Sequence, residues 1–275
     1  MLSLLLSFSA AAENLESDPV AELSVASINI WGLSWPIAKQ RGQRMRALST
    51  LELDSYDVVG MQEVWRGAYR RIPWRERIQR PAARGDSGLA LTGQLPLLTT
   101  PILIPFTASA GVERLKGKGI LISQIAVPDI GPVWVYVTHF QAGSRSGDVR
   151  AAQAEELLAL LADNPGPSIV IGDFNLYQQH ERDAQTEQRL AGAGLQDVAL
   201  ALENPQATYI ADNPYIWKNE DGERFDRIYL RSGEGIALEA VETAVLAYEE
   251  PLSDHQPLTA RIRVRRDNRK ASRGR

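Results

Sequence analysis

The chain has 275 residues, of which 44% are hydrophobic, so it can bury a full core in one large domain or two small ones, and nothing resembling a linker divides it. It contains no cysteine, which excludes disulfides, thiolate metal sites and cysteine nucleophiles. The net charge of −4 argues against a general nucleic-acid binder, because such binding depends on positive charges that neutralise phosphates.

Residues 1–12 form a short apolar run that ends in three alanines. This pattern indicates the remnant of a signal peptide cleaved before Glu13, although the usual basic start is missing. We therefore expect a secreted or periplasmic protein. The alternative is a cytoplasmic protein whose N-terminus is disordered or packed. The run is too short to span a bilayer.

Alternating and apolar runs predict the elements in chain order. A strand is expected at 23–30, followed by an amphipathic helix over 39–53 whose apolar stripe contains Met45 and Leu48. Glycines and prolines then separate a series of strands, which we expect at 58–62, 87–92, 97–104, 119–127 and 133–138.

The clearest helix spans 148–162, with Asp148 as its cap and a Pro-Gly-Pro sequence in the connection after it. A second helix is expected over 184–191, and strands at 168–172, 225–230, 237–245 and 258–264. Strands outnumber helices, and the helices fall between groups of strands, which favours two packed sheets with helices outside. The domain is predicted to cover 20–265, with 266–275 as a basic, disordered tail.

Basic residues gather in two stretches. Between 261 and 275 there are eight of them and one acid. We expect a solvated end there, with contact to anionic lipid or nucleic acid as the alternative. The second stretch is expected to be a solvated helix face, with a nucleic-acid groove as the alternative; it contains Arg66, Arg70, Arg71, Arg75, Arg77 and Arg80.

Two polar side chains follow apolar strands in the first quarter of the chain. Asn29 lies in Ser-Ile-Asn-Ile-Trp-Gly, and Glu63 in Met-Gln-Glu-Val-Trp. A hard divalent cation prefers carboxylate, amide oxygen and water, and two protein ligands leave room for water and a substrate phosphate. This pattern is typical of Mg²⁺, with Mn²⁺ as the alternative. Considered one at a time, the alternative interpretation is that Asn29 is a turn residue and that Glu63 is a surface acid.

Groups suited to proton transfer follow later strands. Asp173 and Asn175 lie two apart after an apolar strand, where a carboxylate can orient water and an amide can hold a phosphoryl oxygen; the plainer interpretation is an Asp-Asn turn. His255 titrates near neutral pH and follows Asp254, so it can serve as a base or as a phosphate donor. Asp226 is the candidate to hold the His255 ring in one tautomer.

The loop Glu-Arg-Leu-Lys-Gly-Lys-Gly at 113–119 places Lys118 before a strand. Its glycines would let the backbone approach a phosphate, and lysine supplies a point charge. The loop lacks the Walker pattern, and a charged turn is the alternative. Trp35, Trp74 and Trp217 lie near prolines in predicted loops. Core packing is their default role, and membrane contact or substrate stacking the alternative.

Taken together, these motifs resemble the endonuclease/exonuclease/phosphatase superfamily with the DNase I-like fold, over about 23–264. The resemblance is greatest to the neutral sphingomyelinase branch. It rests on Asn-Ile-Trp-Gly at 29, Arg-Met-Arg at 44, Glu-Val-Trp at 63, Ser-Gly-Leu at 87, Gly-Lys at 117, Thr-His-Phe at 138, Gly-Asp-Phe-Asn at 172 and Pro-Leu-Ser-Asp-His at 251.

The resemblance implies a four-layer α/β/β/α sandwich with two packed, mainly antiparallel sheets, and Mg²⁺-dependent phosphodiester hydrolysis. It implies metal binding by Asn29, Glu63 and Asp254, and phosphate contact by His139, Asn175 and Lys118. Three further residues receive catalytic roles: Asp173 positions the water, His255 is the general base, and Asp226 supports the cluster with Asp254. The branch usually has Asp five residues before the lysine, where this chain has Glu113.

Three functions are therefore distinguished. The leading hypothesis is a sphingomyelinase-like phosphodiesterase that acts on a phospholipid, with peripheral membrane contact and in-line attack of an activated water. A nuclease of the same fold is the second, and nucleic acid is the less expected substrate because the body of the chain is acidic. A non-catalytic binding protein is the third. The sequence indicates no protein partner.

Overall fold

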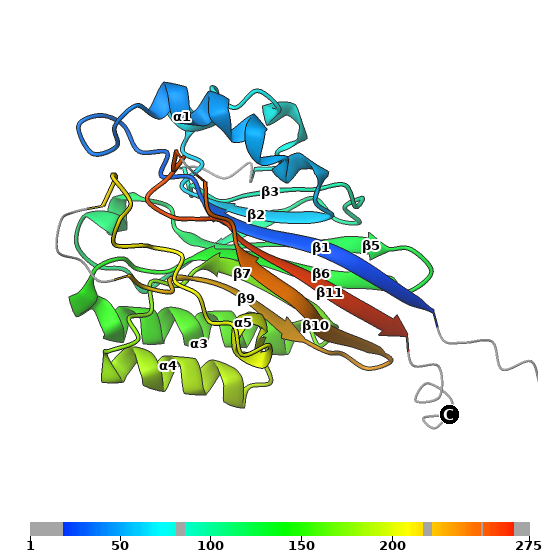
Figure 1. The fold of residues 1–275 in the computed structure, drawn as a ribbon. Coiled ribbons are helices and arrows are strands. Elements are labelled where there is room, and N and C mark those ends of the chain that lie inside the picture. The colour runs from blue at the N-terminus through cyan, green and yellow to red at the C-terminus, as the bar shows by residue number, and fades with distance from the viewer. Residues whose placement is uncertain (1–18, 81–85, 217–221, 249, 267–275) are drawn as a thin grey trace, which may run out of the picture.

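The computed structural model describes residues 19–80, 86–216, 222–248 and 250–266. The predicted signal-peptide remnant, Trp217 and positions 267–275 of the basic tail lie outside the described residues. Within them, two β-sheets pack face to face, and helices cover parts of their outer faces (Figure 1).

The first sheet contains β1 (Val20–Asn29), β2 (Val58–Gln62), β3 (Ala90–Thr92), β10 (Ile236–Val245) and β11 (Leu258–Arg266), in the order β10-β11-β1-β2-β3. The second contains β4 (Ile102–Pro105), β5 (Gly119–Val127), β6 (Gly131–His139), β7 (Ser168–Asp173), β8 (Gln196–Asp197) and β9 (Asp226–Arg231), in the order β4-β5-β6-β7-β9-β8. The α-helices are α1 (Arg41–Ala47), α2 (Arg66–Tyr69), α3 (Gly147–Asp163), α4 (Glu181–Gly192) and α5 (Val198–Ala201). Short 3₁₀ helices lie at Leu48–Leu51, Leu53–Ser55, Arg75–Arg77, Gly111–Leu115 and Ser144–Ser146.

Three hydrophobic cores separate the layers. Inward side chains of both sheets, such as Val25 and Ile169, form the central core. Met45 of α1 packs on the outside of the first sheet, and Leu157 of α3 and Leu190 of α4 belong to the core outside the second. Three cores between four layers confirm the predicted α/β/β/α sandwich.

Strand direction decides where the site lies. Among the described strands, β1 pairs with β2 and β6 pairs with β7 in parallel, and the other pairings are antiparallel. The sheets are therefore mainly antiparallel, as predicted. The four strands of the two parallel pairs, two in each sheet, all end at the same end of the sandwich.

The predicted helix over 39–53 is wrong in its length. The α-helix ends at Ala47, and two 3₁₀ helices follow, separated by Glu52 with a left-handed φ of 49°. The hydroxyl groups of Ser49 and Thr50 donate to the carbonyls of Arg46 and Ala47. Such local bonds compete with the helical pattern, which explains why periodicity alone overestimated the helix.

Other predicted boundaries also shift. Asp148 does not cap α3, because it lies in the first turn and pairs with Arg182 at 2.8 Å. The strand at 87–92 shortens to β3, since Gly88 adopts a positive φ of 69° and belongs to a loop. The strand at 97–104 shortens to β4, after two prolines that lack an N–H, Pro96 and Pro101.

The two basic stretches differ from their predicted form. α2 has four residues, so the arginines between 66 and 80 do not form one long helix face. In the stretch from 261 to 275, residues up to Arg266 belong to β11. Its outward arginines pair with acids of β1 and β10: Arg261 with Glu242, Arg263 with Glu22, and Arg265 with Glu239. Their charge is therefore largely balanced within the sheet.

Candidate active site

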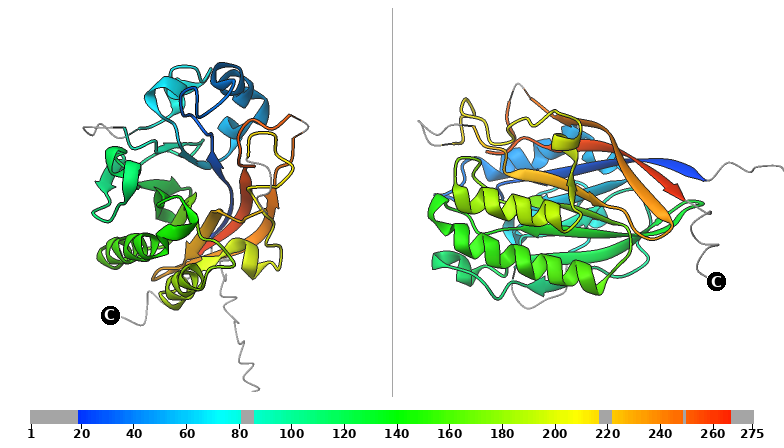
Figure 2. Two further views of the ribbon diagram at one scale, coloured as in Figure 1. Left: turned by 90° about the vertical axis from the view of Figure 1, so that its left-hand side faces the viewer. Right: turned by 90° about the horizontal axis from the view of Figure 1, so that it is seen from below.

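The predicted site residues come together at one end of the sandwich, which faces the viewer in the left panel of Figure 2. Asn29, His139 and Asp173 are the last residues of β1, β6 and β7, and Glu63 directly follows β2. The loop before β11 brings Ser253, Asp254 and His255 to the same place. Residues from both sheets thus meet because the strands that carry them end together.

A cavity of about 440 Å³ opens at this end. Glu63 and His255 line the same cavity, as a convergent site requires. Three aromatic residues, Tyr177, Tyr209 and Phe225, form part of the cavity lining beside the polar residues. The residues of the cavity lining that the sequence predicted for the site are Asn29, Glu63, His139, Asp173, Asn175, Asp254 and His255.

Asp173 is the centre of the polar network. Its Oδ2 accepts a hydrogen bond from Asn29 Nδ2 at 2.9 Å, and lies 3.4 Å from His139 Nε2 and 3.9 Å from His255 Nε2. Burial raises the pKa of Asp173 to about 6, against the lowering effect of His255. Asp173 is therefore mostly ionised at neutral pH and can orient a water molecule.

His255 is held from behind by Asp226, the first residue of β9. Asp226 Oδ2 lies 2.7 Å from His255 Nδ1, and Tyr209 packs edge-on against the His255 ring. Burial by itself lowers the pKa of His255, but the surrounding carboxylates, Asp226 foremost, raise it to about 10. Asp226 does not line the cavity; its contact orients the ring that does.

His139 has the opposite electrostatic environment. Burial lowers the pKa of its imidazole well below the ordinary value, and the positive charges of Lys118, Lys116 and His255 lower it further. The ring is therefore neutral at physiological pH. Its Nε2 faces Asp173, whereas its buried Nδ1 has no hydrogen-bond partner.

Asn175 reaches the cavity because its backbone adopts a left-handed φ of 50°, a conformation that asparagine tolerates better than most residues. Its backbone N–H donates to Asp173 Oδ1 at 3.1 Å, and its side-chain Nδ2 donates to the Phe140 carbonyl at 3.3 Å. One N–H of that amide remains available for a ligand.

The Ser-Asp-His loop is tied to β1. Ser253 Oγ donates to the Asn29 carbonyl at 2.6 Å. Arg44, fully buried under the loop, donates to the carbonyls of Ile30 and Leu252 at 3.1 and 2.8 Å. The sequence signal for Arg44 was only its place in a resemblance motif. Its structural role, which is to join the loop after β1 to the loop before β11, was not predicted.

The donors at Asn29, Glu63 and Asp254 fit a hard divalent cation. Burial raises the pKa of Asp254 to about 7, and the nearby charges of Glu63 and Asp173 act in the same direction. A group of acids that repel one another in this way favours a bound cation. The amide of Asn29 presents its nitrogen to Glu63 Oε1 at 3.4 Å, and its oxygen accepts from Trp31 N. It would have to turn to offer oxygen. Among the described residues, no group of three or more His, Asp and Glu side chains forms a ready-made metal cluster.

Lys118 lies beside the site, not in the cavity lining. Its ammonium donates to Glu113 Oε2 at 3.0 Å and to the Phe140 carbonyl at 2.9 Å. Burial lowers the pKa of Lys118, and the charge of Glu113 only partly offsets this. In this arrangement Lys118 supports the loop after β6 through Phe140. Its direct contact with substrate stays a prediction.

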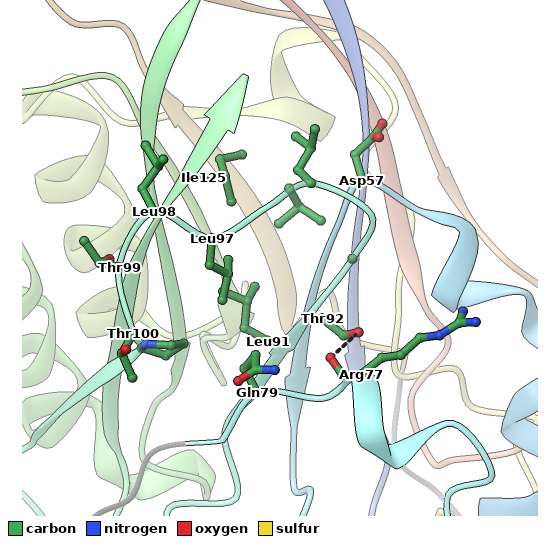
Figure 3. Close-up of a pocket in the computed structure, with 14 residues that line it drawn as sticks. Asp57, Arg77, Gln79, Leu91, Thr92, Leu97, Leu98, Thr99, Thr100 and Ile125 are labelled. Atoms are coloured by element: carbon green, nitrogen blue, oxygen red, sulfur yellow. Dashed lines mark hydrogen bonds between the residues drawn. The ribbon is translucent and has the colours of Figure 1, made fainter. Parts of the chain in front are cut away.

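A second cavity, of about 450 Å³, lies near the edge of the first sheet, at the opposite end of β2 (Figure 3). Leu91, Leu97 and Ile125 are among its apolar lining. Asp57 at its margin accepts hydrogen bonds from the backbone and side chain of Ser24, both at 2.8 Å. The predicted site residues line the first cavity and not this one.

The two described tryptophans that were predicted to lie in loops, Trp35 and Trp74, differ in how exposed they are. Trp74 packs against the core on the outside of the first sheet, which matches the default interpretation. Trp35 is 83% exposed in the loop after β1.

The sandwich, with carboxylates, an amide and two histidines at its strand ends, is typical of the phosphoester hydrolases of the DNase I-like fold. Residues 26–255 match the sequence model of the Endonuclease/Exonuclease/phosphatase family, and the chain belongs to this family. This confirms the family predicted from the motifs.

A sphingomyelinase is among the proteins whose sequences are similar to the chain. The chain is 25% identical over 287 residues to a sphingomyelinase of Mycobacterium tuberculosis, a match that covers 93% of this chain and 56% of that protein. The chain thus spans little more than half the length of this relative. The match agrees with the predicted likeness to the sphingomyelinase branch.

Solved structures share the fold. D. rerio TDP2, complexed with a single-stranded DNA product, has a TM-score of 0.73 at 21% identity, over 88% of this chain and 99% of that one. A Staphylococcus aureus beta toxin with bound magnesium ions has a TM-score of 0.68 at 17% identity, over 87% and 99%.

Proposed function

We propose that the chain is a metal-dependent phosphodiesterase that hydrolyses a phospholipid such as sphingomyelin. One observation carries this proposal: Asp173 Oδ2 and His255 Nε2 are 3.9 Å apart at the floor of the cavity. That separation is too long for a direct hydrogen bond and suits one bridging water. A water held there can attack a phosphorus atom bound in the cavity.

The histidine pair divides the work of proton transfer and binding. Asp226 engages His255 Nδ1, which leaves Nε2 to accept a proton from the water. A positioned base of this kind contributes typically about 10²–10⁴ in rate. His139 and Asn175 line the same cavity, and neutral donors there can hold phosphoryl oxygens as charge develops.

Glu63, Asp254 and Asn29 would hold the cation, which we propose to be Mg²⁺, with Mn²⁺ as the alternative. When bound, it supplies positive charge that neutralises a phosphoryl oxygen and opposes the carboxylates that raise the pKa of His255. The base role of His255 therefore depends on the charge balance of these acids.

The surface at the cavity end supports a lipid substrate and a peripheral contact with membranes. Trp35 and Ile37 in the loop after β1 are 83% and 64% exposed, and Val112 and Leu115 before β5 are 76% and 91% exposed. Exposed tryptophan and aliphatic tips are typical of proteins that lie at a bilayer interface. Basic side chains, exposed Lys39 and Arg114, stand among them, which suits anionic headgroups. In the described part of the chain, no helix is long and apolar enough to cross a membrane.

A nucleic-acid phosphodiester is the second candidate. Arg66, Arg70 and Arg71 are exposed and follow Glu63, which lines the cavity, by a few residues. The fold shared with TDP2 in complex with DNA product supports this alternative.

The test compares substrates under one set of conditions. Purified protein is incubated with sphingomyelin vesicles, phosphatidylcholine vesicles and plasmid DNA, each with Mg²⁺, with Mn²⁺ or with a chelator, and Asp173→Asn is the inactive control. We expect headgroup release from sphingomyelin that the chelator abolishes. Cleavage of plasmid alone would reject the lipid proposal. Without any hydrolysis and without Mg²⁺ binding by calorimetry, the non-catalytic hypothesis would hold.

Export is also a proposal. The apolar run and the three alanines that follow it support a secreted or periplasmic location. Protein recovered from the periplasm or the medium should begin at Glu13 on N-terminal sequencing.

A further inference from the structure

Gln62, the last residue of β2, is a buried amide without partners. The residue is 0% exposed, and neither Oε1 nor Nε2 makes a hydrogen bond. A buried polar group that loses its partner costs about 1–3 kcal/mol, and buried amides in proteins are nearly always paired. Gln62 therefore needs a partner close by, reached by a small side-chain rotation or through one buried water.

The register across the sandwich identifies that partner. A Cβ on Gly60, two residues earlier on the same face of β2, would meet Ile171 of β7 at 2.6 Å and Val137 of β6 at 3.2 Å. The three strands run toward the same end, and side chains two residues apart share a face. One such step further brings Gln62 opposite His139 and Asp173.

His139 also has a buried polar atom without a hydrogen-bond partner. Its ring is buried, and Nδ1 has no partner, while Nε2 lies 3.4 Å from Asp173 Oδ2. A neutral imidazole carries one N–H and one bare nitrogen. Since a carboxylate faces Nε2, the proton belongs on Nε2, and Nδ1 then requires a donor.

We propose that Gln62 is a positioning residue whose Nε2 donates to His139 Nδ1 and so holds His139 in the tautomer that carries its proton on Nε2. The N–H at Nε2 then points into the cavity, where it would donate a hydrogen bond to a phosphoryl oxygen. Ser27 completes the arrangement: it lies inward on β1, in register with Gly60, and its buried Oγ is also unpaired. Its hydroxyl can donate to Gln62 Oε1.

An amide suits this place better than a carboxylate. Burial foremost, and then the charges of Lys118, Lys116 and His255, disfavour a second proton on His139, so the ring acts as a neutral donor. A carboxylate at position 62 would instead favour an imidazolium, and would accept from Nδ1–H where the proposed arrangement needs a donor.

The tautomer can be read directly, because the chain contains three histidines, His139, His180 and His255. Long-range ¹H–¹⁵N spectra of ¹⁵N-histidine-labelled protein, assigned with His139→Gln, distinguish the two neutral tautomers. We expect His139 to carry its proton on Nε2 in the parent. Gln62→Leu should give a mixture of tautomers, and Gln62→Glu should move the proton to Nδ1 or add a second one.

Ser123→Ala is the matched control, because Ser123 is equally buried but lies on β5 and bonds Thr99; it should leave the His139 signals unchanged. Circular dichroism checks that each variant is folded. Retention of the Nε2–H tautomer in both Gln62 variants would overturn the inference. If Gln62→Leu does not fold, Gln62→Glu alone decides by the same criterion.

Kinetics extend the test and rest on the proposed function. We expect Gln62→Leu to lower kcat about 10–100-fold, the range seen when a supporting hydrogen bond behind a site residue is lost, with KM little changed. The tautomer is measured without substrate. A tautomer change in a protein that hydrolyses no phosphodiester would therefore refute the proposed function and leave the positioning role intact.

Discussion

Replacing Arg150 by methionine tests how the loop after β6 is held against the cavity. Arg150 is fully buried in α3, and its Nε and Nη2 donate to Asp183 of α4 at 2.8 and 2.6 Å. Its Nη1 donates to the carbonyls of Gln141 and Gly143 at 3.1 and 2.7 Å. One guanidinium thus joins two helices to a loop that lines the cavity.

The size of the effect follows from what the substitution leaves behind. Arg150→Met keeps an apolar stem but leaves the Asp183 carboxylate buried without its cation. Removing one partner of a buried ion pair costs about 3–5 kcal/mol. Because Asp183 retains the backbone N–H of Tyr177 at 3.2 Å, we expect the lower end, about 3 kcal/mol. For a domain of this size that lowers Tm by roughly 6–12 °C.

Urea unfolding followed by circular dichroism measures this loss in Arg150→Met, Asp183→Leu and the double variant. Replacing both partners by apolar groups removes the unpaired charge. We therefore expect the double variant to lose less stability than the two single losses added together. A loss below about 1 kcal/mol in Arg150→Met, or strict additivity, would contradict the assigned role. Hydrolysis should fall as well, since Gly143 lines the cavity.

Three further predictions concern the site and its surroundings. His255→Ala should lower kcat/KM for vesicle hydrolysis by about 10²–10⁴ with an unchanged circular dichroism spectrum; parent-like turnover would remove His255 from the mechanism. In Glu113, burial raises the pKa, but Lys118 and the Ala142 N–H outweigh it and the pKa falls below the usual 4.5. A lowered pKa stabilises the fold above pH 4.5 and loses its effect as the pH falls through the lowered value. Glu113→Gln should therefore be less stable than the parent at neutral pH, and the gap in urea midpoints should close only in acid. Trp35→Ser should slow hydrolysis of vesicles but not of a water-soluble phosphodiester, and Leu200→Ser, an exposed residue on α5, should change neither; equal losses on both substrates would argue against membrane contact.

The residues of the candidate site could be selected from the sequence because each lies in a short motif, and several of these motifs end an apolar strand. Asn29, Glu63, His139 and Asp173 illustrate this, since a run of β-branched residues shows where a strand ends. Strand existence was predicted well for the same reason. Boundaries failed where local bonds decided them, as at Ser49 and Thr50, and where prolines broke a run, as before β4.

Long-range partners were much harder to predict. Asp226 was named as the candidate to orient His255, and the two lie 2.7 Å apart. The roles of Arg44, Arg150 and Gln62 had no local signal, because their partners lie on other elements. Lys118 was selected as a phosphate contact by its glycine-rich loop, but its ammonium is engaged by Glu113 and the Phe140 carbonyl.

The sequence by itself determined which chemical groups are present and which strands carry them, because hydrophobic periodicity and short motifs act over a few residues. The tertiary structure alone decided which groups share a charge environment. His139 and His255 are the same residue type at strand ends, yet the pKa of one is lowered and that of the other is raised to about 10. Burial and the field of neighbouring charges depend on distance in space, and strand pairing sets that distance between residues far apart along the chain.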